Sequence, residues 1–426
     1  MNFLGVTLIR YARLLATYLV GQGLTQLLKL VIGFILIRAL PKEDYAVFTL
    51  VMAIYATASI LVELGIGQVL IALLGRVHGN AQAMGRYISA CRYYRDRMLC
   101  VGIIALFLIL YWLAPVYGWG THFWLIVWAC IGSSLVFQAV VSIYSPILLL
   151  DQDLKRIYLL GIVSGVFRLS CIGIAYFCGF LNATWAILFG ALQACIDARA
   201  YYCMTRGKFV YPDRSANISK EKKELLGQAL PRVPGYTFLA FEGQITIFIM
   251  SVLGTTNGLA ELGALSRLGM LFIFLDRMGV MLIGPYMAKL RASKVLRKTS
   301  VIIGSVTVFV LGILAVVYCF PSLLLFILGD GYQSLGFEVF LVVLASCIRT
   351  VDVFIFSICS ARKYIYSWFA VLDVLPVIAV MALGFLLLDL SQLTNVLYFA
   401  IAIAAVRFLS KVIIVTVGLR REEIDT

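Results

Sequence analysis

The sequence of 426 residues has few charges, few histidines and no closely paired cysteines. Only 13% of its residues are charged, 62% are hydrophobic, and the mean hydropathy is +1.01. A soluble protein of this length could not cover its surface with so few charges, because charged side chains lie mostly outside. The composition therefore excludes a soluble globular protein and predicts a polytopic, all-α membrane protein.

Two further absences restrict the chemistry. The only histidines are His78 and His122, and the ten cysteines are scattered, mostly inside apolar segments, with no CxxC pair. Metal sites need clustered ligands, so we expect no metal. No Walker A sequence occurs, which excludes nucleotide hydrolysis by this chain as an energy source. We therefore expect no cofactor beyond a coupling ion, either H⁺ or Na⁺.

Apolar runs of about 20 residues or more recur from end to end, each long enough to cross a bilayer core. We predict twelve spans, near 14–40, 45–72, 98–115, 122–149, 157–181, 183–205, 232–254, 258–287, 300–320, 335–360, 364–388 and 395–417. The longest polar segment, from 206 to about 230, divides them into six and six. We therefore predict an N-terminal lobe at 1–222, with a cytoplasmic linker from about 206, and a C-terminal lobe at 223–426.

The net charge of +14 could indicate a nucleic-acid partner, but the placement of the charges argues against one. Basic residues cluster in every second loop, and Lys42 is the only basic residue of the intervening loops. This is the positive-inside pattern, which sets orientation in the membrane. It predicts that both termini are cytoplasmic.

Several charges fall inside the predicted spans, where an arginine costs about 2.5–3.5 kcal/mol on insertion scales. Glu242 and Asp352 are the acids near the middle of their spans. Asp276 and Arg277 are adjacent, so their charges roughly cancel. Glu63, Asp197 and Asp373 are expected nearer the cytoplasm. The cations well inside spans are Lys29, Arg168, Arg267, Arg349 and Arg407. Cations therefore outnumber acids near the midplane, which favours an anionic ligand over purely structural ion pairs.

Helical phase groups some of these residues with other polar side chains. Gln22, Gln26 and Lys29 share one narrow face of the first span. Arg349 and Asp352 are one turn apart, which predicts a local ion pair. Any one of these polar residues could equally serve only in helix packing. Glu242, Asp352 and Asp276 are the candidates for ion coupling.

The stretch "RYISACRYYRDR" at 86–97 is both basic and aromatic. It could touch anionic headgroups at the membrane surface. It could equally be an ordinary loop that sets topology, and the sequence leaves both interpretations open.

The start of the chain resembles a known family. The stretch "LLATYLVGQGLTQLLKLVIGFILIRALPKEDYAVFTLVMAI" and the later "LVELGIGQVLIALLGR" are similar to the first two spans of Wzx-type polysaccharide flippases. These belong to the multidrug/oligosaccharidyl-lipid/polysaccharide exporter (MOP) superfamily. Leu40, Pro41, Glu43, Asp44 and Tyr45 fit the family's first outer loop. Ala46 stands where glycine is usual, and the similarity covers about 70 residues.

The resemblance implies a MATE-like fold of two six-helix lobes in the bacterial inner membrane. It implies a transporter rather than an enzyme, one that moves an undecaprenyl-diphosphate-linked oligosaccharide, such as an O-antigen unit, to the periplasmic leaflet by alternating access. A polysaccharide polymerase and chain-length proteins would be its partners. Lys29, Arg168, Arg267, Arg349 and Arg407, with Gln22 and Gln26, would then line a cationic cavity for the anionic headgroup.

Two other functions remain as alternatives. A drug or cation antiporter of the same superfamily would better suit a net-negative interior. A membrane glycan polymerase or ligase would be expected to carry a large outer loop with catalytic Arg or His residues, whereas every predicted outer loop here is short and nearly uncharged.

Overall fold

A computed structural model describes residues 2–213, 217–288, 290, 292–364 and 369–424. These residues are almost entirely helical, and none of them lies in a β-strand. The chain forms two compact units. The first comprises Met1–Ile32 and Ala39–Ile245, and the second comprises Gly33–Arg38 and Thr246–Thr426. Residues 223–242, which were predicted to begin the C-terminal lobe, lie in the first unit.

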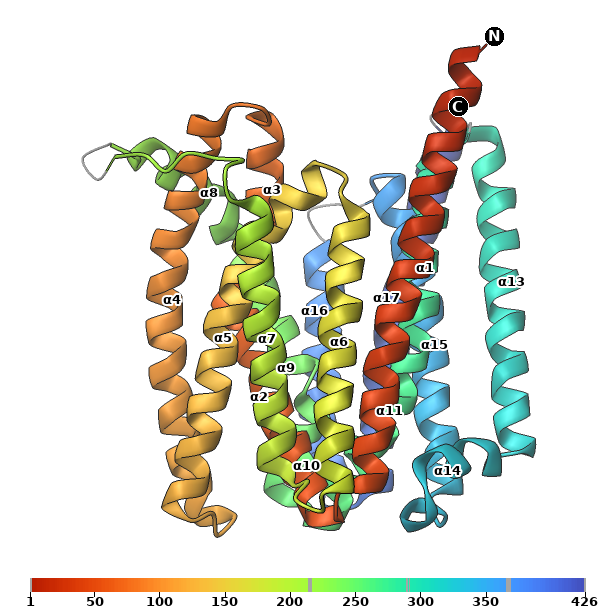
Figure 1. Cartoon of the computed structure of the whole chain (residues 1–426). Helices are drawn as coiled ribbons and strands as arrows, with labels where there is room; N and C mark the ends of the chain where they lie inside the picture. Colours follow the sequence, from red (N-terminus) through yellow and green to blue (C-terminus); the bar gives the residue numbers. More distant parts are fainter. Residues whose placement is uncertain (1, 214–216, 289, 291, 365–368, 425–426) are drawn as a thin grey trace. The chain divides into compact units, whose positions relative to one another are not determined.

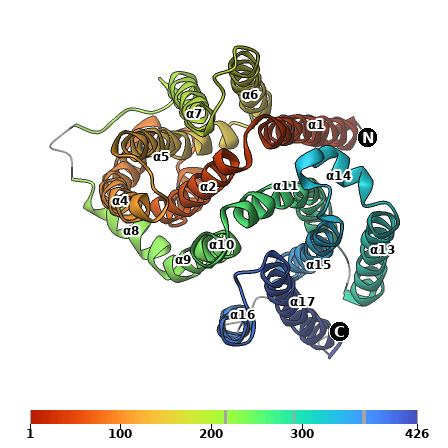
Figure 2. The ribbon, with the colours of Figure 1, turned by 90° about the horizontal axis from the view of Figure 1, so that it is seen from below.

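The first unit is a bundle of long helices with shorter helices packed among them (Figure 1). Its helices are α1 (Asn2–Ala39), α2 (Lys42–Glu63), α3 (Ile66–Arg76), α4 (Ala81–Val116), α5 (Thr121–Leu150), α6 (Leu154–Phe177), α7 (Ala183–Thr205), α8 (Ser219–Ala229) and α9 (Val233–Glu242). Helix α7 packs against α5 and α6, and α5 packs against α4. Seen from below, α2, α4 and α5 lie together (Figure 2).

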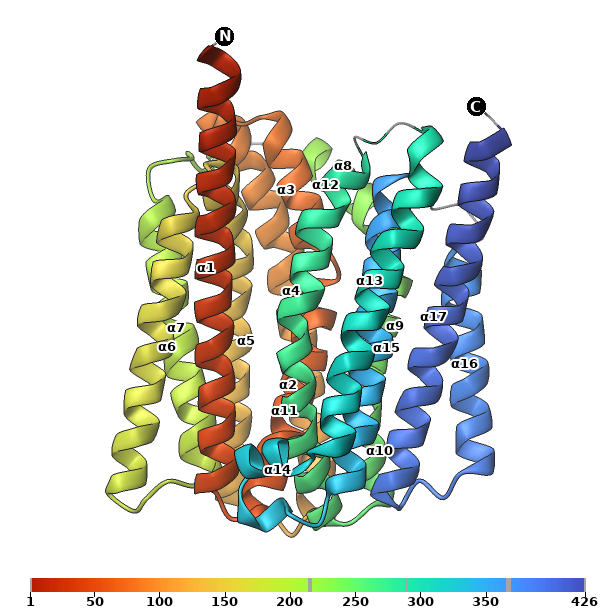
Figure 3. The same cartoon turned by 90° about the vertical axis from the view of Figure 1, so that its right-hand side faces the viewer.

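The second unit is arranged around α15 (Gly336–Ala361), which packs most extensively against α17, α11 and α13. Figure 3 shows these helices running alongside one another. The other elements are α10 (Ile245–Leu253), α11 (Thr256–Met278), a π-helical turn (Gly279–Ile283), α12 (Gly284–Ala288), α13 (Ala292–Cys319), α14 (Ser322–Leu328), α16 (Phe369–Leu387) and α17 (Leu393–Ile424).

Helix boundaries follow local chemistry. Asn80, Asn182 and Thr255 each cap a helix by accepting a hydrogen bond from a backbone N–H three residues on. Helix α2 ends where Leu64 and Gly65 adopt left-handed backbone angles, with φ of 41° and 73°. A Cβ at Gly65 would lie 2.2 Å from the Tyr236 ring of α9, so glycine is also needed for this close approach.

Nine helices among the described residues are long and apolar enough to cross a membrane. The helix pair Ser219–Glu242 and Ile245–Leu253 meets the test together, and Val371–Leu387 is a shorter apolar helix. The chain is thus a multi-pass membrane protein, as predicted. A helix lies within each of the twelve expected ranges, with residues 365–368 of the range 364–388 outside the described residues. The number of membrane spans and the side on which the termini lie stay predictions.

Within the first unit, the α3–α4 and α5–α6 connections and the last turn of α7 lie at one end of the bundle, which we call the loop end (Figure 1). The α4–α5 and α6–α7 connections lie at the opposite end. Basic residues are concentrated at the first of these ends, which is the alternation that the sequence predicts for this part of the chain.

Candidate functional site

The second unit contains a buried carboxylate held by two donors from a neighbouring helix. Asp276 of α11 is 8% exposed. It accepts a hydrogen bond from Arg349 Nη2 at 3.0 Å and another from Thr350 Oγ1 at 2.9 Å. The Arg349 side chain itself remains 53% exposed. Asp276 therefore anchors one edge of a guanidinium whose remaining donors can still meet a ligand or water.

This pairing corrects the prediction that Arg349 would pair with Asp352, one turn along the same helix. Asp276 lies on the helix packed against α15, and Thr350 provides it with a second donor. Asp352 is buried and interacts electrostatically with Lys411 and Arg407 of α17. Arg277, expected to cancel the charge of Asp276, is exposed on the surface of α11.

A second ion pair joins α16 to α17 through Lys411 and Asp373. Lys411 is only 4% exposed, and its ammonium lies 5.7 Å from the centre of the Phe356 ring. Lys411 was not predicted from the sequence as a site residue, and the position of Asp373 near one end of its span predicted that it would not meet the cations. The available signal was spacing, since Lys411 follows Arg407 by four residues and so shares its helix face.

Asp352 differs from Asp276 and Asp373, which both accept hydrogen bonds from basic side chains. Its Oδ1 atom is buried and has no hydrogen-bond partner among the described residues. Buried carboxylate oxygens are usually hydrogen-bonded, so such an atom is a candidate for holding a proton or a cation.

Arg267 of α11 packs against α1 at a glycine. A Cβ at Gly33 would lie 3.3 Å from Arg267 Cδ, and Arg267 Nη1 contacts Met270 Sδ at 3.7 Å. The absence of a side chain at residue 33 therefore makes room for the arginine within the second unit.

In the first unit, Lys29 lies near Asp197, and Arg168 packs against α7. The Arg168 guanidinium lies against Gly190 of α7, 3.4 Å from the position of a Cβ there. On α7, Asp197 interacts with the Ser164 hydroxyl and, electrostatically, with Lys29. Asp197 was expected to lie away from the cations, but it contributes a negative charge near Lys29.

The remaining predicted residues are dispersed. Gln22 and Gln26 are half-buried on α1. Glu242 is the last residue of α9 and is also half-buried. Asp276 pairs with Arg349 and Asp197 interacts with Lys29, so the excess of positive charge is smaller than the sequence predicts.

The chain matches a known protein family. Residues 15–290 match the model of polysaccharide biosynthesis proteins. The chain is a member of this polysaccharide biosynthesis family. No curated protein sequence matches it.

Solved structures show the fold of this family member. A variant of the Vibrio cholerae MATE transporter VcmN is 14% identical, with 96% of each chain covered and a TM-score of 0.59. An inward-facing multidrug resistance MATE transporter of the MOP superfamily is 13% identical, with 94% and 95% covered and a TM-score of 0.60. A MOP superfamily transporter from Pyrococcus furiosus, described as having a binding pocket of reversed polarity, is 13% identical, with 97% and 95% covered and a TM-score of 0.59. The chain therefore has the MATE fold, as the resemblance implied.

One arginine of this polysaccharide biosynthesis protein is buried although the sequence did not predict it. Arg95 was assigned to a cytoplasmic loop, but it lies inside α4 and is fully buried. Its Nη1 donates to the Ala139 carbonyl at 2.9 Å and to Ser142 Oγ. It lines a cavity of about 10 Å³ with Glu63, which is room for about one water. The signal was helical phase, because Ile88, Cys91 and Arg95 share one buried face.

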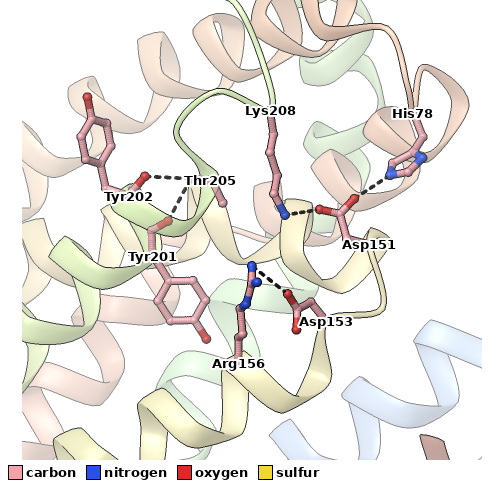
Figure 4. A network of polar contacts seen from close by, with 8 residues as sticks. All are labelled: His78, Asp151, Asp153, Arg156, Tyr201, Tyr202, Thr205 and Lys208. Carbon is pink, nitrogen blue, oxygen red and sulfur yellow. Dashed lines mark hydrogen bonds and ion pairs between the residues drawn. The ribbon is translucent and has the colours of Figure 1, made fainter.

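A polar network joins three connections at the loop end of the first unit (Figure 4). Asp151 accepts hydrogen bonds from Lys208 and from His78, whose Nε2 lies 3.0 Å from Oδ1. Burial alone would raise the pKa of Asp151, but the hydrogen bonds from Lys208 and His78 outweigh it and lower that pKa. Asp153 pairs with Arg156 at 3.2 Å. This network connects the α3–α4 and α5–α6 connections with the segment after α7.

No group of three or more His, Cys, Asp or Glu side chains within the described ranges could hold a metal ion.

Proposed function

We propose that this protein is a flippase for undecaprenyl-diphosphate-linked oligosaccharide units. It would move each unit from the cytoplasmic to the periplasmic leaflet of the bacterial inner membrane by alternating access. Membership of a polysaccharide biosynthesis family and the MATE fold support this proposal. A transporter accounts for both the family membership and the fold. A polymerase or chain-length protein would then act on the delivered unit.

The observation that carries the proposal is the arrangement of Arg349. Asp276 fixes one edge of the guanidinium at 3.0 Å while the side chain stays 53% exposed. A guanidinium has five N–H donors and binds phosphate in a bidentate manner. An arginine positioned in advance and still accessible is therefore suited to recognise a pyrophosphate, because little side-chain freedom is lost on binding.

The other predicted cations would extend this recognition. Lys29, Arg168, Arg267 and Arg407 would contact phosphate or acidic sugar groups, and Gln22 and Gln26 would bond sugar hydroxyls. A pyrophosphate arriving at Arg349 would compete with Asp276. Uptake of H⁺ or Na⁺ at Asp276, Asp352 or Glu242 would then offset the displaced negative charge.

Replacing Arg349 tests the proposal. In a strain that lacks the gene, Arg349→Gln should lower delivery of lipid-linked glycan to the periplasmic leaflet at least tenfold, and Arg349→Lys should retain part of it. Losing a charge-assisted contact of about 1.5–3 kcal/mol corresponds to roughly 10- to 150-fold. The measurement is a leaflet-resolved assay of the lipid-linked glycan, with protein insertion checked in parallel.

Arg277→Gln is the matched control, because Arg277 is an exposed arginine of α11. It should leave delivery within about twofold of the intact protein. Normal delivery by a well-inserted Arg349→Gln protein would contradict the proposed role of this residue. Drug resistance conferred by the intact protein, without any effect on glycans, would favour the antiporter instead.

A further inference from the structure

The surface where α8 docks on α4 carries more positive charge than its acids neutralise. Helix α8 lies beside the loop end of α4 (Figures 1 and 2). Glu221 pairs with Arg86 at 3.6 Å, and Asp96 pairs with Arg92 at 3.5 Å. Glu224 pairs with Arg76 at 3.1 Å and accepts a hydrogen bond from Tyr87 at 2.6 Å. Each of these carboxylates is thus already engaged.

Two cations left over from this pairing meet at a single aromatic ring. The Arg97 guanidinium of α4 lies 3.5 Å from the centre of the Tyr93 ring, and the Lys222 ammonium of α8 lies 3.3 Å from it. Neither has a carboxylate partner among the described residues. Both interact with the ring's negative faces, and no carboxylate of the described residues pairs with either cation to offset their mutual repulsion. The arrangement therefore favours an anion beside the ring.

The position of Arg97 along α4 indicates where that anion would lie. No charged residue occurs in 98–116, the part of α4 that follows it. At 1.5 Å per residue these residues span about 28 Å, close to the roughly 30 Å hydrocarbon thickness of a bilayer. Arg97 is consequently at the level of the lipid phosphates when this run crosses the membrane.

The helix face below Arg97 is apolar and exposed. Val101, Ile104 and Leu108 follow Arg97 at intervals of four, three and four residues, so they share its face. Their exposed fractions are 64%, 62% and 59%. An acyl chain along this face would continue directly from a phosphate held by Arg97 and Lys222.

We propose that Tyr93, Arg97 and Lys222 form a binding site for an anionic phospholipid of the surrounding leaflet. The lipid phosphate bridges Arg97 and Lys222 at the edge of the Tyr93 ring, and an acyl chain lies on Val101, Ile104 and Leu108. The bound lipid joins α4 to α8 and so holds the segment that leads into α9. The site is separate from the cations proposed to bind the transported headgroup.

Native mass spectrometry of the full-length protein, titrated with phosphatidylglycerol in mixed micelles, tests this site. Arg97→Gln and Lys222→Gln should each weaken phosphatidylglycerol binding about fivefold, since a basic residue near an anionic membrane surface contributes about 1 kcal/mol. The double variant should weaken it more than tenfold. Phosphatidylcholine should bind the intact protein and the variants equally.

Lys220→Gln is the matched control, because it removes one exposed positive charge from the same helix. It should change binding less than twofold. Tyr93→Leu keeps both charges and should still weaken binding, which provides a second test if a charge variant fails to fold. Equal losses for Lys220→Gln and Lys222→Gln would overturn the site in favour of general surface attraction. Tighter competition at this site by undecaprenyl phosphate than by phosphatidylglycerol would assign it to the transported lipid and also overturn the proposal.

Discussion

The two units pair their charges at different depths. In the second unit, Lys411 pairs with Asp373 between neighbouring helices where both side chains are largely hidden. In the first unit, the ion pairs gather at the loop end, as with Lys208 and Asp151, which are about 30% exposed. The buried Arg95 of that unit is bound instead by a carbonyl and a hydroxyl. Exposed pairs contribute little to stability, whereas breaking a buried pair is costly.

The largest effect is expected on breaking the buried pair of the second unit. Lys411→Met should destabilise the protein by about 3 kcal/mol, because Asp373, whose side chain is only 21% exposed, would be left without its partner. The unfolding temperature of the purified protein in detergent measures this change.

The double variant Lys411→Met with Asp373→Leu supplies the control. It removes both charges and should recover most of the loss, because buried pairs can often be replaced by apolar residues without net cost. A double variant as unstable as Lys411→Met would show that packing, and not the unpaired carboxylate, explains the loss.

A smaller effect is expected where the first unit relies on a close backbone contact. A Cβ at Gly85 would lie 1.7 Å from the Val210 carbonyl oxygen, beside the hydrogen bond from Val210 N to the Ala81 carbonyl. Gly85→Ala should therefore cost about 1–3 kcal/mol, as overpacking does. Gly132→Ala is the matched helical control, since nothing lies within 4 Å of its Cβ position. Equal unfolding temperatures for the two variants would rule out a steric role for Gly85.

Hydropathy and charge placement were enough to predict an all-helical membrane protein, because the bilayer imposes segment length and apolar composition directly. They did not predict that α8 and α9 pack with the first unit, since the charged stretch of α8 looks like a linker. Its docking depends on contacts distant in sequence, such as Tyr87 with Glu224. The break at Gly65 was also missed, because an apolar run reads the same whether or not its helix is interrupted.

The sequence indicates which spans carry charges but not which of those charges meet. Arg349 and Asp352 were singled out because charges inside spans are costly. Spacing on one helix suggested that they pair, but Asp276 on α11 faces Arg349. Helical phase shows which residues share a face and gives no information on the neighbouring helix. Depth along a span is equally uninformative about neighbouring helices, so it did not predict that Asp197 lies near Lys29 or that Asp373 pairs with Lys411.

The smallest effect is expected at the partly exposed pair of the first unit. Asp151 has a pKa below its ordinary value because, despite burial, Lys208 and His78 donate hydrogen bonds to its ionised form. A pKa lowered in the folded state stabilises the protein above the unfolded pKa, and this contribution is lost as the pH falls through the folded pKa. Asp151→Asn should therefore cost less than about 1 kcal/mol at neutral pH.

Unfolding temperatures of the intact protein and of Asp151→Asn, measured from neutral pH downward, check this sign. The difference should stay constant to about pH 4, the ordinary value for aspartate, and shrink below it. Asp153→Asn is the control, because Asp153 pairs with Arg156 within its own helix turn and does not join separate connections. It should change the unfolding temperature less. A difference for Asp151→Asn that grows as the pH falls would contradict a lowered pKa, and a loss as large as that of Lys411→Met would remove the contrast between the two units.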